Sequence, residues 1–194
     1  MTTFVLASAN PHKVAEMREV LGELGIVLLA RPDEVPAIEE NEDTLEGNAL
    51  VKAHAIMRAT GQAAIADDTG LFVEALRGRP GVVSARYAGE SASDADNVTK
   101  LLRELDGVPE KRRGASFRSV IAVAYPSGKS ICVDGTLDGW ITLARRGDNG
   151  FGYDPVFEPA NSGGRTLAQF TPLEKNATSH RSLALRALVA ALAS

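Results

Sequence analysis

Two adjacent carboxylates follow a short apolar stretch near the middle of the chain. Asp67 and Asp68 come directly after the apolar run 63–66 and precede Thr69 and Gly70. Two neighbouring negative charges are costly to place beside a core, and a divalent cation would offset their repulsion. Because adjacent residues on an extended chain face opposite ways, one carboxylate can bind a metal while backbone N–H groups hold the other. An Asp-rich turn, with Gly70 supplying an unusual dihedral, is the alternative interpretation.

An acidic loop precedes this pair of aspartates. Residues 31–43 contain the carboxylates Glu34, Glu39, Glu40, Glu42 and Asp43. Magnesium prefers oxygen ligands and usually takes only one or two protein carboxylates together with phosphate oxygens. One of these glutamates can therefore complete a metal site with Asp68. The others are expected to be solvated surface charges.

A strand-to-helix turn near the N-terminus is suited to binding phosphate. An apolar run predicts a strand, and Asn10 can cap a helix that begins at Pro11, where the missing N–H of proline costs nothing. Free N–H groups at a helix start attract phosphate, and Lys13 adds a full positive charge. Small side chains at Ser8 and Ala9 would let the backbone approach a ligand. A plain turn with a surface lysine is the alternative, and the Walker pattern is absent.

Two later segments carry aromatic and cationic side chains. Residues 147–155 place glycines beside aromatic residues, and Phe151 is suited to stacking on a base. For Tyr153, a role in filling the core is equally consistent with the sequence. Lys175 and the Ser-His-Arg segment 179–181 supply donors, since arginine suits bidentate contacts to phosphate or a base carbonyl.

The elements that must position these residues follow an α/β pattern. Apolar residues at helical spacing predict helices over 11–24, 45–60, 95–105 and 182–192. Strands are expected at 4–8, 26–30 and 63–66, followed by a hairpin of 116–125 and 130–143. Further expected features are a helical turn at 71–76, a turn at 80–81 and a capping box at 171–174. This order predicts an α/β protein with a mixed sheet, whose flanking lobes would leave a cleft for a small ligand.

Composition limits the class of protein. The 194 residues, 44% of them hydrophobic, suit one domain or two tightly joined lobes. A net charge of −4 without a basic stripe argues against general nucleic-acid binding. The single cysteine, Cys132, precludes an internal disulfide and favours a reducing compartment. The N-terminal residues form a poor signal peptide and too short an apolar run for a membrane span, so we expect a cytoplasmic protein without membrane association.

Taken together and in order, these segments resemble the inosine triphosphate pyrophosphatase family, which hydrolyses non-standard purine nucleoside triphosphates such as ITP, dITP and XTP. The resemblance spans nearly the whole chain, through the segments LASANPHKVAEM, EENEDTLEGNALVKA, ADDTGLFVEAL, PGVVSARYAGE, GFGYDPVF and LEKNATSHRSLAL. It implies an elongated mixed α/β sheet whose flanking helices form two lobes around a central cleft, as one domain over 1–194. It also implies Mg²⁺ as cofactor and a homodimer.

The resemblance also assigns site residues. It implies that Asp68 is the catalytic base and a metal ligand, with Glu40 as the second metal-site carboxylate and Glu39 as the alternative to Glu40. The substrate contacts that it implies are Ser8, Ala9, Asn10, Pro11, His12, Lys13, Thr69, Phe151, Gly152, Tyr153, Asp154, Lys175, His180 and Arg181. The family's phosphate loop usually reads Thr-Gly-Asn-x-x-Lys, so alanine replaces glycine here.

These residues suggest a mechanism, with two rivals. Asp68 would orient or deprotonate a water that attacks the α-phosphorus, leaving a monophosphate and pyrophosphate. His180 and Arg181 would donate to the carbonyl at the purine 6 position, where adenine carries an amino group. One rival is a Maf-like nucleotide pyrophosphatase, although the arginines of that family's opening loop are missing here. The other is a non-catalytic nucleotide-binding regulatory protein, against which the acidic pair argues.

Overall fold

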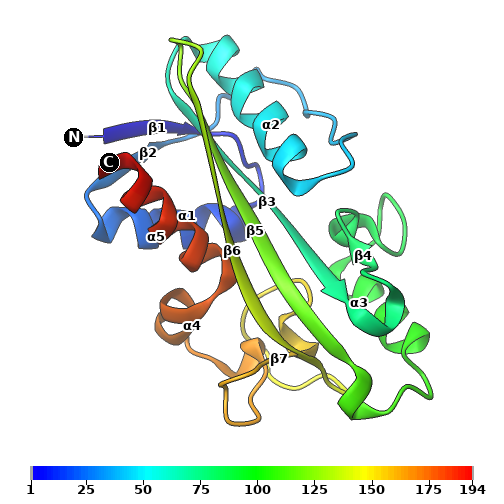
Figure 1. Ribbon diagram of the computed structural model, residues 1–194. Helices are drawn as coiled ribbons and strands as arrows, with labels where there is room; N and C mark the ends of the chain where they lie inside the picture. The colour runs from blue at the N-terminus through cyan, green and yellow to red at the C-terminus, as the bar shows by residue number, and fades with distance from the viewer. Residues whose placement is uncertain (1, 194) are drawn as a thin grey trace. The chain divides into compact units, whose positions relative to one another are not determined.

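The computed structural model describes residues 2–193, which divide into two compact units (Figure 1). Unit 1 comprises residues 2–68, 119–135 and 180–193, and unit 2 comprises residues 69–118 and 136–179. Three long strands contribute residues to both units, namely β3 (Ala64–Val73), β5 (Gly114–Ala124) and β6 (Ser130–Ile141).

The strands form a seven-stranded sheet with the order β2-β1-β3-β5-β6-β7, in which β4 also pairs with β3. Strand β1 (Thr2–Leu6) is parallel to β2 (Ile26–Leu29) and to β3. Strand β4 (Pro80–Gly81) is antiparallel to β3, and β7 (Phe157–Pro159) is antiparallel to β6. The predicted mixed α/β sheet with flanking helices is therefore confirmed.

Unit 1 contains three helices, α1 (Pro11–Glu23), α2 (Leu45–Thr60) and α5 (His180–Ala193). Helix α1 begins after Asn10, as predicted, and packs against α5, beside which it lies in Figure 1. Helix α2 begins after Thr44, whose hydroxyl accepts the N–H of the third helical residue. These caps satisfy donors that each helix start would otherwise leave without a partner.

The core of unit 1 has two faces because side chains alternate along β1. Phe4 and Leu6 pack in a cluster with α1 and α5, whereas Val5 packs in a second cluster with alanines of α2. Both faces of the parallel strands are thus covered by helices, as parallel sheets require.

Unit 2 contains two helices, α3 (Asp94–Glu104) and α4 (Pro172–Thr178). It also has five short helical turns, at Glu74–Leu76, Ser84–Arg86, Glu110–Arg112, Asp154–Val156 and Leu167–Gln169. The capping box predicted for residues 171–174 is present, with Thr171 and Glu174 bonded reciprocally at the start of α4. One apolar cluster, which includes Leu101, Phe117 and Phe157, forms the core of this unit.

The sequence prediction was wrong for the segment that begins at Asp67. Strand β3 does not end at residue 66 but continues through Asp67 and Asp68 to Val73. Gly70 does not adopt a positive φ, so the alternative interpretation, an Asp-rich turn with an unusual dihedral at Gly70, is wrong. A Cβ at Gly70 would lie 2.5 Å from the carbonyl oxygen of Gly81, so glycine allows close pairing with β4, the segment expected to be a turn. Strand β3 is therefore paired with β4 at Leu71 and Phe72, and it also neighbours β5 in the sheet.

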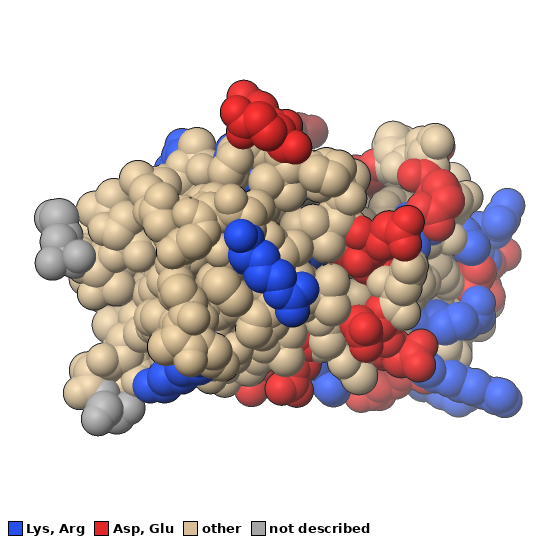
Figure 2. Space-filling model, turned by 90° about the horizontal axis from the view of Figure 1, so that it is seen from above, with Lys and Arg blue, Asp and Glu red and all other residues tan. Residues whose placement is uncertain are grey.

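The molecular surface carries charges of both signs. On the face shown in Figure 2, acidic and basic side chains are interspersed rather than gathered into one broad basic patch. Within residues 2–193, no helix combines the length and the apolar character that crossing a membrane requires.

Candidate active site residues in each unit

The buried carboxylate of Asp67 joins two cationic side chains of unit 1. Its Oδ1 lies 3.1 Å from Nζ of Lys13, in the first turn of α1, and its Oδ2 accepts a hydrogen bond of 3.0 Å from Nε of Arg181 at the start of α5. Arg181 also forms an ion pair with Glu16 on α1 through Nη1. The lysine of the predicted phosphate loop and the arginine of the Ser-His-Arg segment therefore meet at one carboxylate.

The charges in this group stabilise one another. Burial alone would raise the pKa of Asp67, but the cations of Lys13 and Arg181 outweigh it and hold that pKa well below its usual range. Burial alone would lower the pKa of Arg181, but Asp67 and Glu16 raise it. The lowered pKa means that Asp67 is ionised at neutral pH and is a poor proton acceptor there.

Asp68 points to the other side of β3 and has different partners. Its Oδ1 accepts a hydrogen bond of 2.7 Å from Nζ of Lys52, and its Oδ2 lies 3.5 Å from Nδ2 of Asn48. The same Nζ lies 3.2 Å from Oε1 of Glu40. Glu39 is exposed and accepts a hydrogen bond from a neighbouring asparagine in its own loop. Asp68 and Glu40 therefore share one ammonium group.

The surroundings of Asp68 favour proton acceptance. Burial raises the pKa of Asp68, although the ammonium of Lys52 opposes the rise. Burial alone would lower the pKa of Lys52, but Asp68 and the other nearby carboxylates raise it, so Lys52 stays charged. A carboxylate with a raised pKa is a stronger base than an ordinary aspartate once it is ionised.

The predicted phosphate loop is exposed at Ala9, Asn10, Pro11 and His12, and half-buried at Ser8. Oδ1 of Asn10 accepts the backbone N–H groups of His12 and Lys13 at 3.0 and 3.2 Å. The hydroxyl of Ser8 accepts the N–H of Asn10 at 3.2 Å. The loop is therefore held in shape by its own side chains, and it presents these polar groups at a helix start that has no acidic residue in its first turn.

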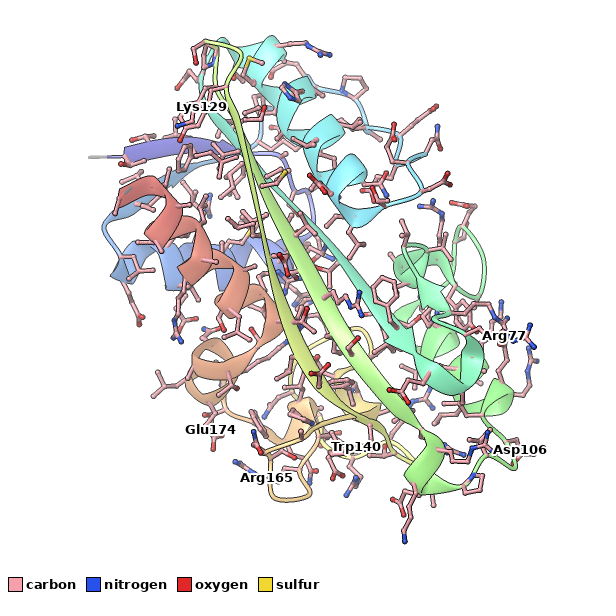
Figure 3. All side chains as sticks on the ribbon, in the orientation of Figure 1. Arg77, Asp106, Lys129, Trp140, Arg165 and Glu174 are labelled. Atoms are coloured by element: carbon pink, nitrogen blue, oxygen red, sulfur yellow. The ribbon has the colours of Figure 1, made fainter. Side chains whose placement is uncertain are left out.

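Unit 2 brings together Phe151, Asp154 and Lys175. Nζ of the buried Lys175 lies 2.5 Å from Oδ2 of Asp154 and 4.5 Å from the centroid of the Phe151 ring. The same Oδ2 accepts the backbone N–H of Phe151 at 2.9 Å. Gly150 has a φ of +76°, and a Cβ there would lie 2.0 Å from this oxygen, so glycine is required. Lys175 follows Glu174, labelled in Figure 3, which caps α4.

The remaining predicted contacts have less direct roles in their units. The Tyr153 side chain is buried in the core of unit 2, and its hydroxyl donates to the carbonyl of Ser84 at 2.8 Å. The N–H of Gly152 donates to the Asp94 carboxylate at 2.7 Å. Thr69 is half-buried on β3, and His180 is buried at the first position of α5. Two other residues are therefore already bonded to the Tyr153 hydroxyl and the Gly152 amide.

Sequence reasoning missed Lys52, Asn48 and Glu16. On α2, Asn48 and Lys52 share the buried face with Ala49 and Ala53, at spacings of three and four residues. Two polar residues on an otherwise apolar face of a helix could have indicated that Asn48 and Lys52 have buried polar partners. Glu16 follows the loop lysine by three residues on α1, but its partner Arg181 lies far away in the sequence.

Glu40 and Asp68 are a fitting donor set for magnesium. Among residues 2–193, no group of three or more His, Cys, Asp or Glu side chains could hold a metal ion by itself. Magnesium, however, commonly binds one or two carboxylates and completes its shell with water and substrate phosphates. The two carboxylates lie 3.2 and 2.7 Å from the Lys52 ammonium, so they are close enough to each other to bind one ion together.

Comparison with known proteins identifies the family. The sequence model of the Ham1 family matches residues 4–191. A protein of Mycolicibacterium paratuberculosis named dITP/XTP pyrophosphatase is 48% identical over 197 residues, covering 99% of this chain and 96% of the relative. One of the same name from Nitratidesulfovibrio vulgaris is 49% identical over 195 residues, covering 96% and 94%. A solved HAM1 protein from Coxiella burnetii superposes with a TM-score of 0.89 at 43% identity, covering 100% of this chain and 99% of its own. The chain therefore belongs to the Ham1 family.

Proposed function

We propose that this protein hydrolyses non-standard purine nucleoside triphosphates, ITP, dITP and XTP, to the monophosphate and pyrophosphate. The observation that carries the proposal is that Asp68 on β3 and the half-buried Glu40 of the acidic loop share the ammonium of the buried Lys52. Family relatives named dITP/XTP pyrophosphatase support the substrate class. The reaction removes such nucleotides from the pool.

Asp68 is the proposed general base. It takes a proton from the water that attacks the α-phosphorus, and the bond between the α-phosphorus and the bridging oxygen breaks to release pyrophosphate. Lys52 and Asn48 contact one carboxylate oxygen each, so they orient the group. A positioned base of this kind contributes about 10²–10⁴-fold to the rate.

Cationic groups are proposed to bind the triphosphate. In unit 1, Lys13 and the loop from Ser8 through Ala9, Asn10, Pro11 and His12 face the tail, and in unit 2 Lys175 contributes a further charge. Lys13 is partly exposed, with 19% of its side-chain surface accessible, so it can reach a ligand while it contacts Asp67. Multiple cations are needed because the tail carries several negative charges.

Glu40 and Asp68 are the proposed ligands of Mg²⁺. When bound, this ion neutralises charge on the phosphate oxygens and stabilises the leaving pyrophosphate. Lys52 holds the two carboxylates together and keeps their mutual repulsion low.

Base selection is proposed to combine stacking with hydrogen bonding. Phe151 stacks on the purine, with Gly152, Tyr153 and Asp154 shaping its loop. His180 and Arg181 act as donors towards the 6-carbonyl of the base. Adenine presents an amino group there, so a donor would meet a donor, and such a mismatch at a buried polar site gives large discrimination. Thr69 is the remaining proposed contact.

We also propose that the two units act as one nucleotide pyrophosphatase domain over residues 1–194, that the protein is a homodimer, and that it works in the cytoplasm without nucleic-acid or membrane partners. The lone Cys132 supports a reducing compartment. Size-exclusion chromatography with light scattering would test the homodimer.

A panel of nucleoside triphosphates tests the proposed function. The protein is incubated with dITP, XTP, dATP, dGTP and dCTP, with and without Mg²⁺, and pyrophosphate is assayed separately from orthophosphate. We expect magnesium-dependent pyrophosphate release with dITP and XTP strongly preferred. A preference for pyrimidine nucleotides would indicate a Maf-like activity, and binding without turnover would indicate a regulatory protein.

A further inference from the structure

Asp67 is a buried carboxylate that the proposed chemistry does not use. It is 2% exposed on β3, where side-chain alternation directs it away from the base Asp68. Each of its two oxygens contacts a different cation, Lys13 on one and Arg181 on the other. Burying a charge costs free energy unless it is paired, so the pairing accounts for its stability. It does not account for the choice of these two partners.

The two partners come from opposite ends of the chain and have different proposed tasks. Lys13 lies in the first turn of α1 and is a proposed phosphate contact, whereas Arg181 lies at the start of α5 and is a proposed base contact. Arg181 is 1% exposed, so the position of its side chain is set by the groups packed around it. Asp67 therefore contacts one residue proposed to bind the phosphates and one proposed to bind the base.

Neighbouring contacts make this arrangement rigid. Glu16, one turn after Lys13 on α1, also pairs with Arg181. Gly135 on β6 packs directly under the start of α5, where a Cβ would lie 2.3 Å from the carbonyl oxygen of His180. The start of α5 is therefore fixed against α1 through Glu16, against β3 through Asp67 and against β6 through Gly135.

We propose that Asp67 is a positioning residue that sets Lys13 and Arg181 relative to each other, so that triphosphate binding and base selection are coupled through one carboxylate. The inference rests on the proposed function, because it assumes that Lys13 and Arg181 contact the substrate. A phosphate tail that draws Lys13 towards it leaves more of the Asp67 charge to Arg181. Tail binding then strengthens the hold on the base-selecting arginine.

The variant Asp67→Asn tests this role because it keeps the shape and removes the charge. We expect the KM for dITP to rise about tenfold and the ratio of kcat/KM for dITP over dATP to fall about tenfold, since small misplacements of contacting groups have effects of this size or larger. Asp134→Asn, at an exposed position of β6 in the same unit, is the control and should leave both quantities unchanged. A folded Asp67→Asn protein with an unchanged KM and an unchanged ratio would overturn the proposal.

A double-mutant cycle covers the case in which Asp67→Asn does not fold. Lys13→Gln and Arg181→Lys each leave Asp67 with a cationic partner, and both act on the same carboxylate. Their combined effect on kcat/KM for dITP should differ from the product of the single effects by about fivefold, as is typical of residues that share a partner. Strictly multiplicative effects contradict the coupling. A wild-type protein that releases no pyrophosphate from dITP contradicts the proposed function instead, before any variant is compared.

Discussion

Two groups of buried and half-buried charged residues, one in each unit, differ in their numbers of acidic and basic side chains. The β3 cluster of unit 1 contains four carboxylates and three cations, namely Glu16, Glu40, Asp67 and Asp68 with Lys13, Lys52 and Arg181. The aromatic cluster of unit 2 contains one carboxylate, one cation and a ring, namely Asp154, Lys175 and Phe151. The first has an acidic excess that can accept a further cation, whereas the second is neutral and offers a flat apolar surface. The first cluster is accordingly the proposed place of the chemistry at phosphorus, and the second supplies the proposed stacking ring together with one cation for the phosphates.

The two clusters also differ in how the chain assembles them. The β3 cluster joins residues up to 165 positions apart, such as Glu16 and Arg181. In the aromatic cluster, Asp154 and Lys175 are only 21 positions apart. The β3 cluster therefore depends on the whole fold of unit 1, and the aromatic cluster depends mainly on a glycine-containing loop and a helix cap.

The largest expected effect is that of Asp68→Asn on turnover. The substitution removes the negative charge and the proposed base but keeps the volume of the side chain and an oxygen that can accept from Lys52, so kcat for dITP should fall by about 10²–10⁴-fold. Pyrophosphate release is the measurement, and circular dichroism checks that the fold is kept. Near-normal turnover would show that Asp68 is not the general base. It would also show that the acidic excess of the β3 cluster is not needed for the reaction.

Removing the buried cation from each cluster compares their stabilities. Arg181→Met breaks two ion pairs at a fully buried position, so the free energy of unfolding should fall by about 3–5 kcal/mol. Lys175→Met breaks one pair, and Asp154 keeps its hydrogen bond from Phe151, so a smaller loss is expected. Urea unfolding monitored by fluorescence gives both values. An equal or larger loss for Lys175→Met would contradict the inference that the ion pairs of Arg181 contribute more to stability than the ion pair of Lys175.

Substitutions at two glycines of β6 distinguish a general loss of packing from a specific effect on base selection. A Cβ at Gly135 would lie 2.3 Å from the carbonyl oxygen of His180 in unit 1, and a Cβ at Gly139 would lie 2.2 Å from that of Glu158 in unit 2. Replacing either glycine with alanine should cost about 1–3 kcal/mol of stability through overpacking. Only Gly135→Ala shifts the start of α5, so only it should reduce the preference for dITP over dATP. Similar loss of preference in both variants would show that the effect is not local to α5.

The smallest expected effect concerns the helix cap next to the aromatic cluster. Hydrogen bonds from Thr171 and Arg165 lower the pKa of Glu174 from 4.5 to about 2. A lowered pKa in the folded state means that the ionised group stabilises the fold above about pH 4.5, and this contribution is lost as the pH falls towards 2. Glu174→Gln should therefore lower the unfolding temperature slightly at pH 7, and the difference should vanish near pH 2.

The exposed Glu110→Gln variant is the control for this pH series. It should show no such difference between pH 7 and pH 2. A Glu174→Gln effect that grows with acidity would contradict the sign derived from the lowered pKa.

Local features of the fold were predictable from the sequence. The caps at Asn10 and Thr171 depend only on residues within one turn, and both helices begin where the pattern indicates. The course of β3 was not predictable in this way, because β3 pairs with β1 and β5, which are distant segments of the chain, as well as with β4. Pairing between distant segments leaves no signature in a short window of sequence.

The same distinction applies to the site. The resemblance of short segments pointed to Asp68, Glu40 and Lys13, and the structure places Glu40 and Asp68 around Lys52. Lys52 was missed although it lies on the apolar face of α2, because its partners Glu40 and Asp68 are 12 and 16 positions away in the sequence. For Tyr153, the sequence was equally consistent with a substrate contact and with a role in filling the core. In the structure its side chain lies in the core of unit 2.

The most direct test of the account is the reaction of metal-stripped protein with dITP as Mg²⁺ is added back in H₂¹⁸O. We predict no turnover with excess chelator, recovery on addition of Mg²⁺, equal amounts of dIMP and pyrophosphate, and ¹⁸O in the dIMP. Full turnover in the presence of chelator, or ¹⁸O in the pyrophosphate, would contradict the proposal that Asp68 directs water to the α-phosphorus beside a bound cation.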